Sequence, residues 1–165
     1  MIAGCIMPQD IQAESAPLAS QRPVPIIDRS LLNPAETIVK VELDQAVQNC
    51  SGQAFEIGSL VATDVTANLE ARWWIDYDGT GTPYRVTIFP EKPPSVTRRG
   101  SQLPASAVSK QVFAGKPGAH VIEVLVAYED LWDPKDGLQR RLIAGHAGEF
   151  TSYKWVVDFD PSKCP

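Results

Sequence analysis

The 165-residue sequence contains no long apolar run and no excess of positive charge, and it has only three cysteines. No run approaches the roughly 20 apolar residues that a membrane-spanning helix needs, so the sequence excludes a helix of that kind within it. Acidic residues outnumber basic ones by 20 to 15, which gives a net charge of −5 at pH 7. Nucleic-acid-binding proteins present a basic face, so we expect no nucleic-acid partner.

Signals for long helices are also scarce. No stretch of helical length repeats its apolar residues with the helical period between good caps, whereas 14 prolines and 11 glycines indicate many turns. The chain is 44% hydrophobic, which is too apolar for a chain that is disordered throughout. Its length suits one domain with one core.

Strand-like alternation is what the sequence does contain. Apolar and polar residues alternate over 69–77, 84–88 and 153–159, and residues 121–128 are almost all apolar, as in a central strand covered on both faces. Weaker candidates are 37–43, 55–61 and 107–113. About seven short strands separated by turn residues predict an all-β sandwich.

The first residues carry the most specific motif. Ile2-Ala3-Gly4-Cys5 resembles the lipobox of bacterial lipoproteins. The resemblance implies that a signal peptidase cuts before Cys5 and that this cysteine carries the acyl chains, which anchor the protein to a membrane. Under that family's sorting rule, Ile6 in place of an aspartate after the cysteine predicts the outer membrane.

Residues 1–34 are expected to form the lipobox and a proline-rich tether, and residues 35–165 the domain. The tether contains Pro8, Pro17, Pro23, Pro25 and Pro34 without a sustained period. Proline lacks the amide donor of a ladder or a helix, so we expect a linker that later lies along the domain. Within it, residues 25–28 are a candidate for a short edge strand.

If Cys5 is reserved for lipid, Cys50 and Cys164 remain as one pair. A bridge between them would persist only in an oxidising compartment such as the periplasm or the cell exterior. The alternative is two unrelated buried thiols. We predict the disulfide, because it agrees with export.

Three of the predicted strands resemble the C, F and G strands of an immunoglobulin-like or PKD-like domain: the strand that holds Trp73, residues 117–124 and residues 153–159. The run Arg72-Trp73-Trp74-Ile75-Asp76-Tyr77-Asp78 is similar to one in uncharacterised lipoproteins of myxobacteria-like species. The resemblance covers roughly residues 36–160 and implies an immunoglobulin-like sandwich. It departs from the antibody pattern, in which the disulfide joins the two sheets near a tryptophan.

Catalytic and metal motifs are weak. Residues 76–81 superficially resemble a calcium loop, but Thr87 stands where that pattern needs a glutamate, and a strand end with a tight turn explains the residues equally. His120 and His146 lie outside any nucleophile-elbow context, and we expect both to be structural or solvated. The sequence therefore predicts no enzyme, no cofactor and no metal site.

Surface candidates remain. The basic doublets at 98–99 and 140–141 are expected in loops, as solvated surface. Trp74 follows Trp73 and must face the opposite side of the sheet, where either the tether or a loop covers it, or it is exposed to a partner. The long connection 129–152 either packs on the domain or binds partners. The candidate partner-binding residues are Trp74, Leu131, Trp132, Arg140 and Arg141.

From these features we expect an exported, non-catalytic protein, anchored to the membrane through the lipid on Cys5, that presents its domain for assembly with another envelope protein. The alternative is a carbohydrate-binding module or adhesin in which Trp74 or Trp132 stacks on sugar rings.

Overall fold

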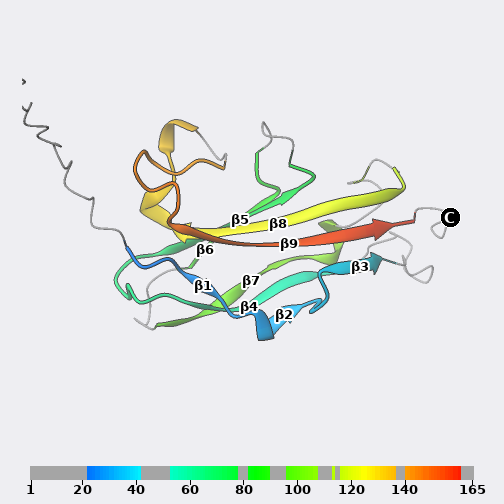
Figure 1. Ribbon diagram of the computed structural model, residues 1–165, viewed down its shortest axis with the longest axis horizontal. Coiled ribbons are helices and arrows are strands. Elements are labelled where there is room, and N and C mark those ends of the chain that lie inside the picture. The colour runs from blue at the N-terminus through cyan, green and yellow to red at the C-terminus, as the bar shows by residue number, and fades with distance from the viewer. Residues whose placement is uncertain are drawn as a thin grey trace, which may run out of the picture.

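The computed structural model describes residues 22–41, 53–77, 82–89, 96–107, 113, 116–136 and 140–160. These residues form two β-sheets packed face to face (Figure 1). The described residues contain no α-helix, only 3-10 helices of three residues each: Arg29–Leu31, Ala105–Ala107, Glu129–Leu131 and Pro134–Asp136. The prediction of an all-β sandwich is confirmed at this level.

The larger sheet has five strands in the order β3-β9-β8-β5-β6. Their bounds are Ile38–Val41 (β3), Phe150–Phe159 (β9), Gly118–Tyr128 (β8), Leu69–Ile75 (β5) and Arg85–Phe89 (β6). Neighbours pair antiparallel, except that β3 runs parallel to β9. Among the described strands, the edges of this sheet are therefore β3 and β6.

The smaller sheet is built around β4, Phe55–Val61. The short strands β1, Ile26–Ile27, and β2, Leu32–Asn33, pair with β4 along one side. On the other side, β4 pairs with β7, Thr97–Leu103. All these pairings are antiparallel.

Each strand predicted from alternation is present where the structure describes it, with small differences at the ends. Two predictions were wrong. Residues 97–103 form β7, although the doublet at 98–99 had been placed in a loop. Ala107, the start of the predicted strand 107–113, ends a 3-10 helix. Residues 108–112 of that prediction lie outside the described residues.

The expected edge strand within 25–28 is confirmed as β1. The pairing extends further than expected, because β2 also joins β4 and Leu32 is buried in the core. The boundary expected after residue 34 therefore comes later in the chain than two strands that already belong to the smaller sheet. Residues 1–21 lie outside the described part of the chain.

Aromatic side chains fill the space between the sheets. Trp73 of β5 stacks on Trp155 of β9 with ring centroids 5.9 Å apart, and Phe55 of β4 meets Trp155 edge-on at 5.4 Å. The indole N–H of Trp73 donates to the Ser101 hydroxyl of β7 (2.9 Å). The two sheets are thereby joined by both apolar packing and a buried hydrogen bond.

Candidate functional site

The connection between β8 and β9 folds back onto the outer face of the five-stranded sheet, the face that points away from β4 and β7 (Figure 1). Within it, Trp132 and Leu142 form an isolated antiparallel bridge, and the amide of Asp133 donates to the carbonyl of Arg141 (3.0 Å). The sequence left two possibilities for this connection, packing on the domain or binding partners. Its described residues, 129–136 and 140–149, pack on the domain. We call this segment the insertion.

The insertion buries three of the candidate partner-binding residues. Trp74, Leu131 and Trp132 are only 2%, 3% and 5% exposed. The Trp74 ring lies 6.5 Å from that of Trp132 and meets Tyr77 edge-on at 5.7 Å. Of the alternatives left open by the sequence, cover is the one observed, because the insertion forms a second apolar layer over the outer face of the sheet.

This layer also encloses a buried ion pair. Glu70 and Arg72 lie two residues apart on β5, and the Arg72 Nε donates to the Glu70 carboxylate. The Arg72 guanidinium sits 3.9 Å from the centroid of the Trp132 ring. A buried charge is costly unless it is paired, which accounts for the contact between Glu70 and Arg72, and the cation–π contact joins this pair to Trp132 of the insertion.

Beside the insertion lies an open cleft of about 390 Å³. It is lined by the end of β5, by β8 and β9 and by the insertion, through Asp76, Tyr77, Val121, Glu123, Arg140 and Lys154. We call it the outer-face cleft. Only Arg140 among its residues had been singled out as a binding residue.

Glu123 forms the floor of this cleft. Its side chain is almost fully buried, and one carboxylate oxygen, Oε1, accepts from Arg140 Nη2 at 2.6 Å and lies 3.2 Å from Lys154 Nζ. The Arg140 guanidinium also lies 5.5 Å from the centroid of the Tyr77 ring. One buried acid thus holds two cations, one of them exposed, at the mouth of the cleft.

Asp76 also lines the cleft. Its carboxylate accepts from the backbone N–H of Val121 (2.7 Å) and contacts His120 Nδ1 (2.5 Å). The second ring nitrogen of His120 faces the carbonyl of Lys116 at 3.0 Å. Both nitrogens of this buried histidine are engaged, so the expectation that His120 is structural is confirmed. The other expected structural or solvated histidine, His146, is half-buried and pairs with Glu149 at 2.8 Å.

The outer-face cleft brings together groups of both charges and an aromatic ring. Arg140 and Lys154 offer hydrogen-bond donors, the exposed Asp76 carboxylate offers acceptors, and Tyr77 adds an aromatic surface. Lys154 lies on β9, and contacts with β8 hold Arg140, through Glu123, and Asp76, through Val121 and His120, which lowers the entropy lost when a partner binds. A partner with both charged and polar groups would fit such a lining.

The two basic doublets differ from the expected solvated surface in one residue each. Arg98 is buried, and its Nη2 donates to the carbonyls of Ala67 (2.9 Å) and Asp64 (3.3 Å), whereas Arg99 is exposed. Arg140 is half-buried against Glu123, whereas Arg141 is exposed. In each doublet, one arginine holds a loop in place and its neighbour faces solvent. Arg98 holds the loop between β4 and β5, and Arg140 holds the insertion against Glu123.

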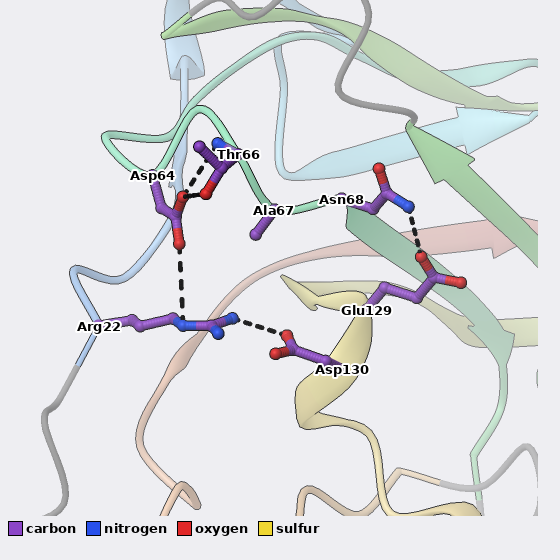
Figure 2. A pocket seen from close by; sticks show the side chains of 7 residues that line it. All are labelled: Arg22, Asp64, Thr66, Ala67, Asn68, Glu129 and Asp130. Atoms are coloured by element: carbon purple, nitrogen blue, oxygen red, sulfur yellow. Dashed lines mark hydrogen bonds and ion pairs between the residues drawn. The ribbon is translucent and has the colours of Figure 1, made fainter.

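A second cavity, of about 290 Å³, lies where the described chain begins (Figure 2). Arg22 spans it: Nη1 donates to Asp130 at 2.7 Å, and Nε lies 3.8 Å from Asp64. Across the cavity, the Asn68 side-chain amide donates to Glu129 (2.7 Å). Arg22 therefore fastens the start of the described chain to the domain.

Charge and burial shift three pKa values around this cavity. Hydrogen bonding to Asp130 raises the pKa of Arg22. The hydroxyl and amide of Thr66 donate to Asp64 and lower the pKa of that carboxyl. Burial raises the pKa of Tyr128, whose hydroxyl donates to the carbonyl of Pro23 at 3.2 Å. The arginine and Asp64 are thus both charged at neutral pH.

Sequence reasoning missed this cavity and most of the outer-face cleft. Arg22 and Asp130 are separated by 108 positions, and no local pattern reports such a contact. Glu123 stands out in the sequence, because it is the one charged residue within the apolar run 121–128. A charge inside a strand that is covered on both faces requires a partner of opposite charge, which here is Arg140.

The lipobox cysteine Cys5 and the predicted pair Cys50 and Cys164 lie outside the described residues. Of the calcium-like run 76–81, the structure describes only Asp76 and Tyr77, and both Asp76 oxygens have protein partners. Within the described residues, no group of three or more His, Cys, Asp or Glu side chains is arranged to hold a metal ion.

Comparison with family models, curated proteins and solved structures gave no match. In the described part of the chain, no helix is long and apolar enough to cross a membrane.

Proposed function

We propose that this is an exported, lipid-anchored, non-catalytic protein of the cell envelope, whose domain presents the outer-face cleft to another envelope protein. The observation that carries the proposal is the arrangement of Glu123, Arg140 and Lys154. A buried acid that fixes two cations at the mouth of an open cleft is built to meet complementary polar groups.

The strand order supports an immunoglobulin-like identity for the domain. The strands expected to correspond to C, F and G are β5, β8 and β9, and they are consecutive neighbours in one sheet. The second sheet pairs β4 with β7, as the B and E strands pair in that fold. A core tryptophan, Trp73, lies on the C-like strand.

The anchor rests on the lipobox at residues 2–5, and the outer-membrane location on Ile6. The described domain begins at Arg22, which is fastened to Asp130 at the end of the sandwich that carries the insertion (Figure 1). A tether that starts at Cys5 would thus join the domain at that end.

Burial of two tryptophans argues against the carbohydrate-binding alternative. It depended on exposed Trp74 or Trp132, and both side chains are buried, Trp74 beneath the insertion and Trp132 as part of it. A polar cleft flanked by ion pairs favours a partner that carries charges of both signs, as a protein surface does.

Labelling with radioactive palmitate in the native host tests the anchor. The wild-type chain should incorporate label and partition with outer membranes, and Cys5→Ala should abolish both. A wild-type chain that stays unlabelled in the soluble fraction would overturn the anchor and the location.

Co-purification from cross-linked envelopes tests the cleft. A protein captured by the wild type should be lost with Lys154→Glu, which reverses a charge that is exposed in the cleft. The matched control is Arg141→Glu, because Arg141 is exposed outside the cleft. Capture that both variants retain, or that both lose, would contradict recognition at this site.

A further inference from the structure

The buried ring of His120 faces two hydrogen-bond acceptors. Its Nδ1 lies 2.5 Å from a carboxylate oxygen of Asp76, and its Nε2 lies 3.0 Å from the carbonyl oxygen of Lys116. A carbonyl can only accept, and a neutral imidazole has one N–H, so that single proton is used at Lys116. The contact with Asp76 therefore needs a second proton, held between Nδ1 and the carboxylate.

The aromatic surroundings of the ring suit a protonated imidazole. Phe113 stacks on His120 with ring centroids 3.9 Å apart, and Phe159 meets it edge-on at 5.9 Å. A cation over the face of an aromatic ring is stabilised by the ring's quadrupole. The carboxylate of Asp76 supplies the opposite charge that a buried cation requires.

The other charged residues on the elements around the ring are exposed or lie on the opposite face. The side chains of Lys116, before β8, and of Asp158 and Asp160, at the end of β9, are exposed. Glu123 is three positions from His120 along β8, so it points to the outer face, whereas His120 points to the core. The second proton is therefore assigned to the Asp76–His120 pair.

Asp76 connects this proton to the outer-face cleft. Its side chain lines the cleft, is 45% exposed, and accepts from the backbone N–H of Val121, which also lines the cleft (2.7 Å). Its φ of 47° lies in the left-handed region, which is unfavourable for a residue with a side chain. The two carboxylate contacts hold Asp76 in this conformation, and its exposed side chain lets the proton exchange with solvent.

Loss of the proton changes the charge at the cleft. Glu123 pairs with Arg140 and Lys154, so these three groups carry one net positive charge. While the proton is held, Asp76 and His120 are neutral as a pair, and the positive charge is uncompensated. When the proton leaves to water, the pair carries one negative charge, and the groups at the cleft become neutral together.

We propose that the outer-face cleft binds a carboxylate of its protein partner beside Lys154, and that the proton held by Asp76 and His120 strengthens this binding. The inference rests on the proposed function and adds the partner's chemistry and a dependence on pH. Lys154 is 54% exposed, so its ammonium is accessible to such a group. An approaching carboxylate meets an extra negative charge once the proton is lost, so binding weakens as the pH rises.

Nitrogen NMR of the histidine rings tests the proton in the full chain carrying Cys5→Ala. The chain has two histidines, so His146→Gln assigns the signals of His120. Asp76→Asn is the matched variant, because its amide donates to Nδ1 in place of the second proton and asparagine tolerates a positive φ. His120 should keep its second proton to a higher pH in the wild type than in Asp76→Asn. The same or the reverse order would overturn the shared proton.

Titration with a tetraglutamate peptide whose ends are blocked tests the cleft in the same chain. Between about pH 8 and pH 6, within the range where histidines change charge, binding should tighten about two- to fivefold, the effect of one exposed charge pair. Lys154→Gln should weaken binding at pH about 6, whereas Lys40→Gln, which removes an exposed cation on β3 outside the cleft, should not. Asp76→Asn should bind with equal affinity at both pH values.

Three outcomes would overturn the proposal: no binding of the peptide at either pH, equal effects of the two lysine variants, or an unchanged pH dependence in Asp76→Asn. These outcomes are distinct from failure of the proposed function. If the peptide does not bind but capture from envelopes still depends on Lys154, the partner's carboxylate is excluded while recognition at the cleft stands.

Discussion

Trp73 and Trp74 are consecutive in β5, and both are buried, in two different apolar layers. Trp73 stacks on Trp155 between the sheets, whereas Trp74 lies beneath the insertion with Trp132. Alternation in a strand sends neighbouring side chains to opposite faces, so this pair requires both faces of β5 to be covered. The strand beside it, β8, is buried on both faces for the same reason, from Ile122 to Tyr128.

The second layer makes Trp132 a stabilising residue. Trp132→Ala should lower the free energy of unfolding by about 3–5 kcal/mol, the usual cost of emptying a large buried site. Trp132→Phe should cost much less, because the Trp132 indole N–H has no acceptor among the described residues. Urea denaturation measures both. A cost below about 1 kcal/mol for Trp132→Ala would mean that the insertion is not packed on the sheet.

How far the sequence predicts this arrangement depends on whether a contact is local. Alternation in 69–77 and 153–159 is a property of consecutive residues, and it predicted the strands and their core faces. The cover over Trp74 is set by residues 58 positions away, at Trp132, so the sequence left its exposure open. The pattern of β7 is polar and interrupted by Gly100, and this strand exists because β4 offers it an edge.

The candidate site shows the same division. Arg140 was predicted as a candidate partner-binding residue, and as half of a basic doublet on solvated surface. Its ion-pair partner, Glu123, lies 17 positions away on β8, and Lys154 on β9 pairs with the same carboxylate. Only the charge of Glu123 within an apolar run indicated that something must meet it.

The doublet on β7 allows a comparison of neighbouring arginines. Arg98→Leu should destabilise the fold by about 1.5–3 kcal/mol, because it leaves the carbonyls of Ala67 and Asp64 without this charged donor. Arg99→Leu should change the unfolding free energy by less than about 0.5 kcal/mol, because Arg99 is exposed. Thermal or urea denaturation of both variants decides, and equal effects would contradict the burial of Arg98.

Close approach of the backbones explains Gly100. A Cβ atom at this position would overlap the carbonyl of Ile57 on the paired strand β4. Gly100→Ala should therefore cost at least about 1–3 kcal/mol, as overpacking does. Gly148→Ala is the control, because a Cβ there meets nothing within 4 Å. If the two alanines have the same effect on the denaturation midpoint, β7 does not pair with β4 in the described register.

Asp64 makes stability depend on pH in the acid range. Its pKa lies below the ordinary 3.8 because Thr66 donates two hydrogen bonds to the carboxylate. A lowered folded-state pKa adds stability above the unfolded value, and that stability is lost as the pH falls below about 4 and through the folded pKa. The stability difference between wild type and Asp64→Asn should shrink over this window. An NMR titration midpoint of Asp64 at or above 3.8 would contradict it.

The last prediction concerns Cys50 and Cys164, which stay a predicted pair. A bridge would close a loop of about 114 residues, worth about 4–5 kcal/mol in the chain-entropy description. At about 2–4 °C per kcal/mol, reduction should lower the thermal midpoint by about 8–16 °C. Thiol titration of denatured, unreduced protein lacking residues 1–5 should find no free thiol. Two titratable thiols in protein from an oxidising compartment would refute the bridge, and would also weaken export, because this pair supports export independently of residues 1–5.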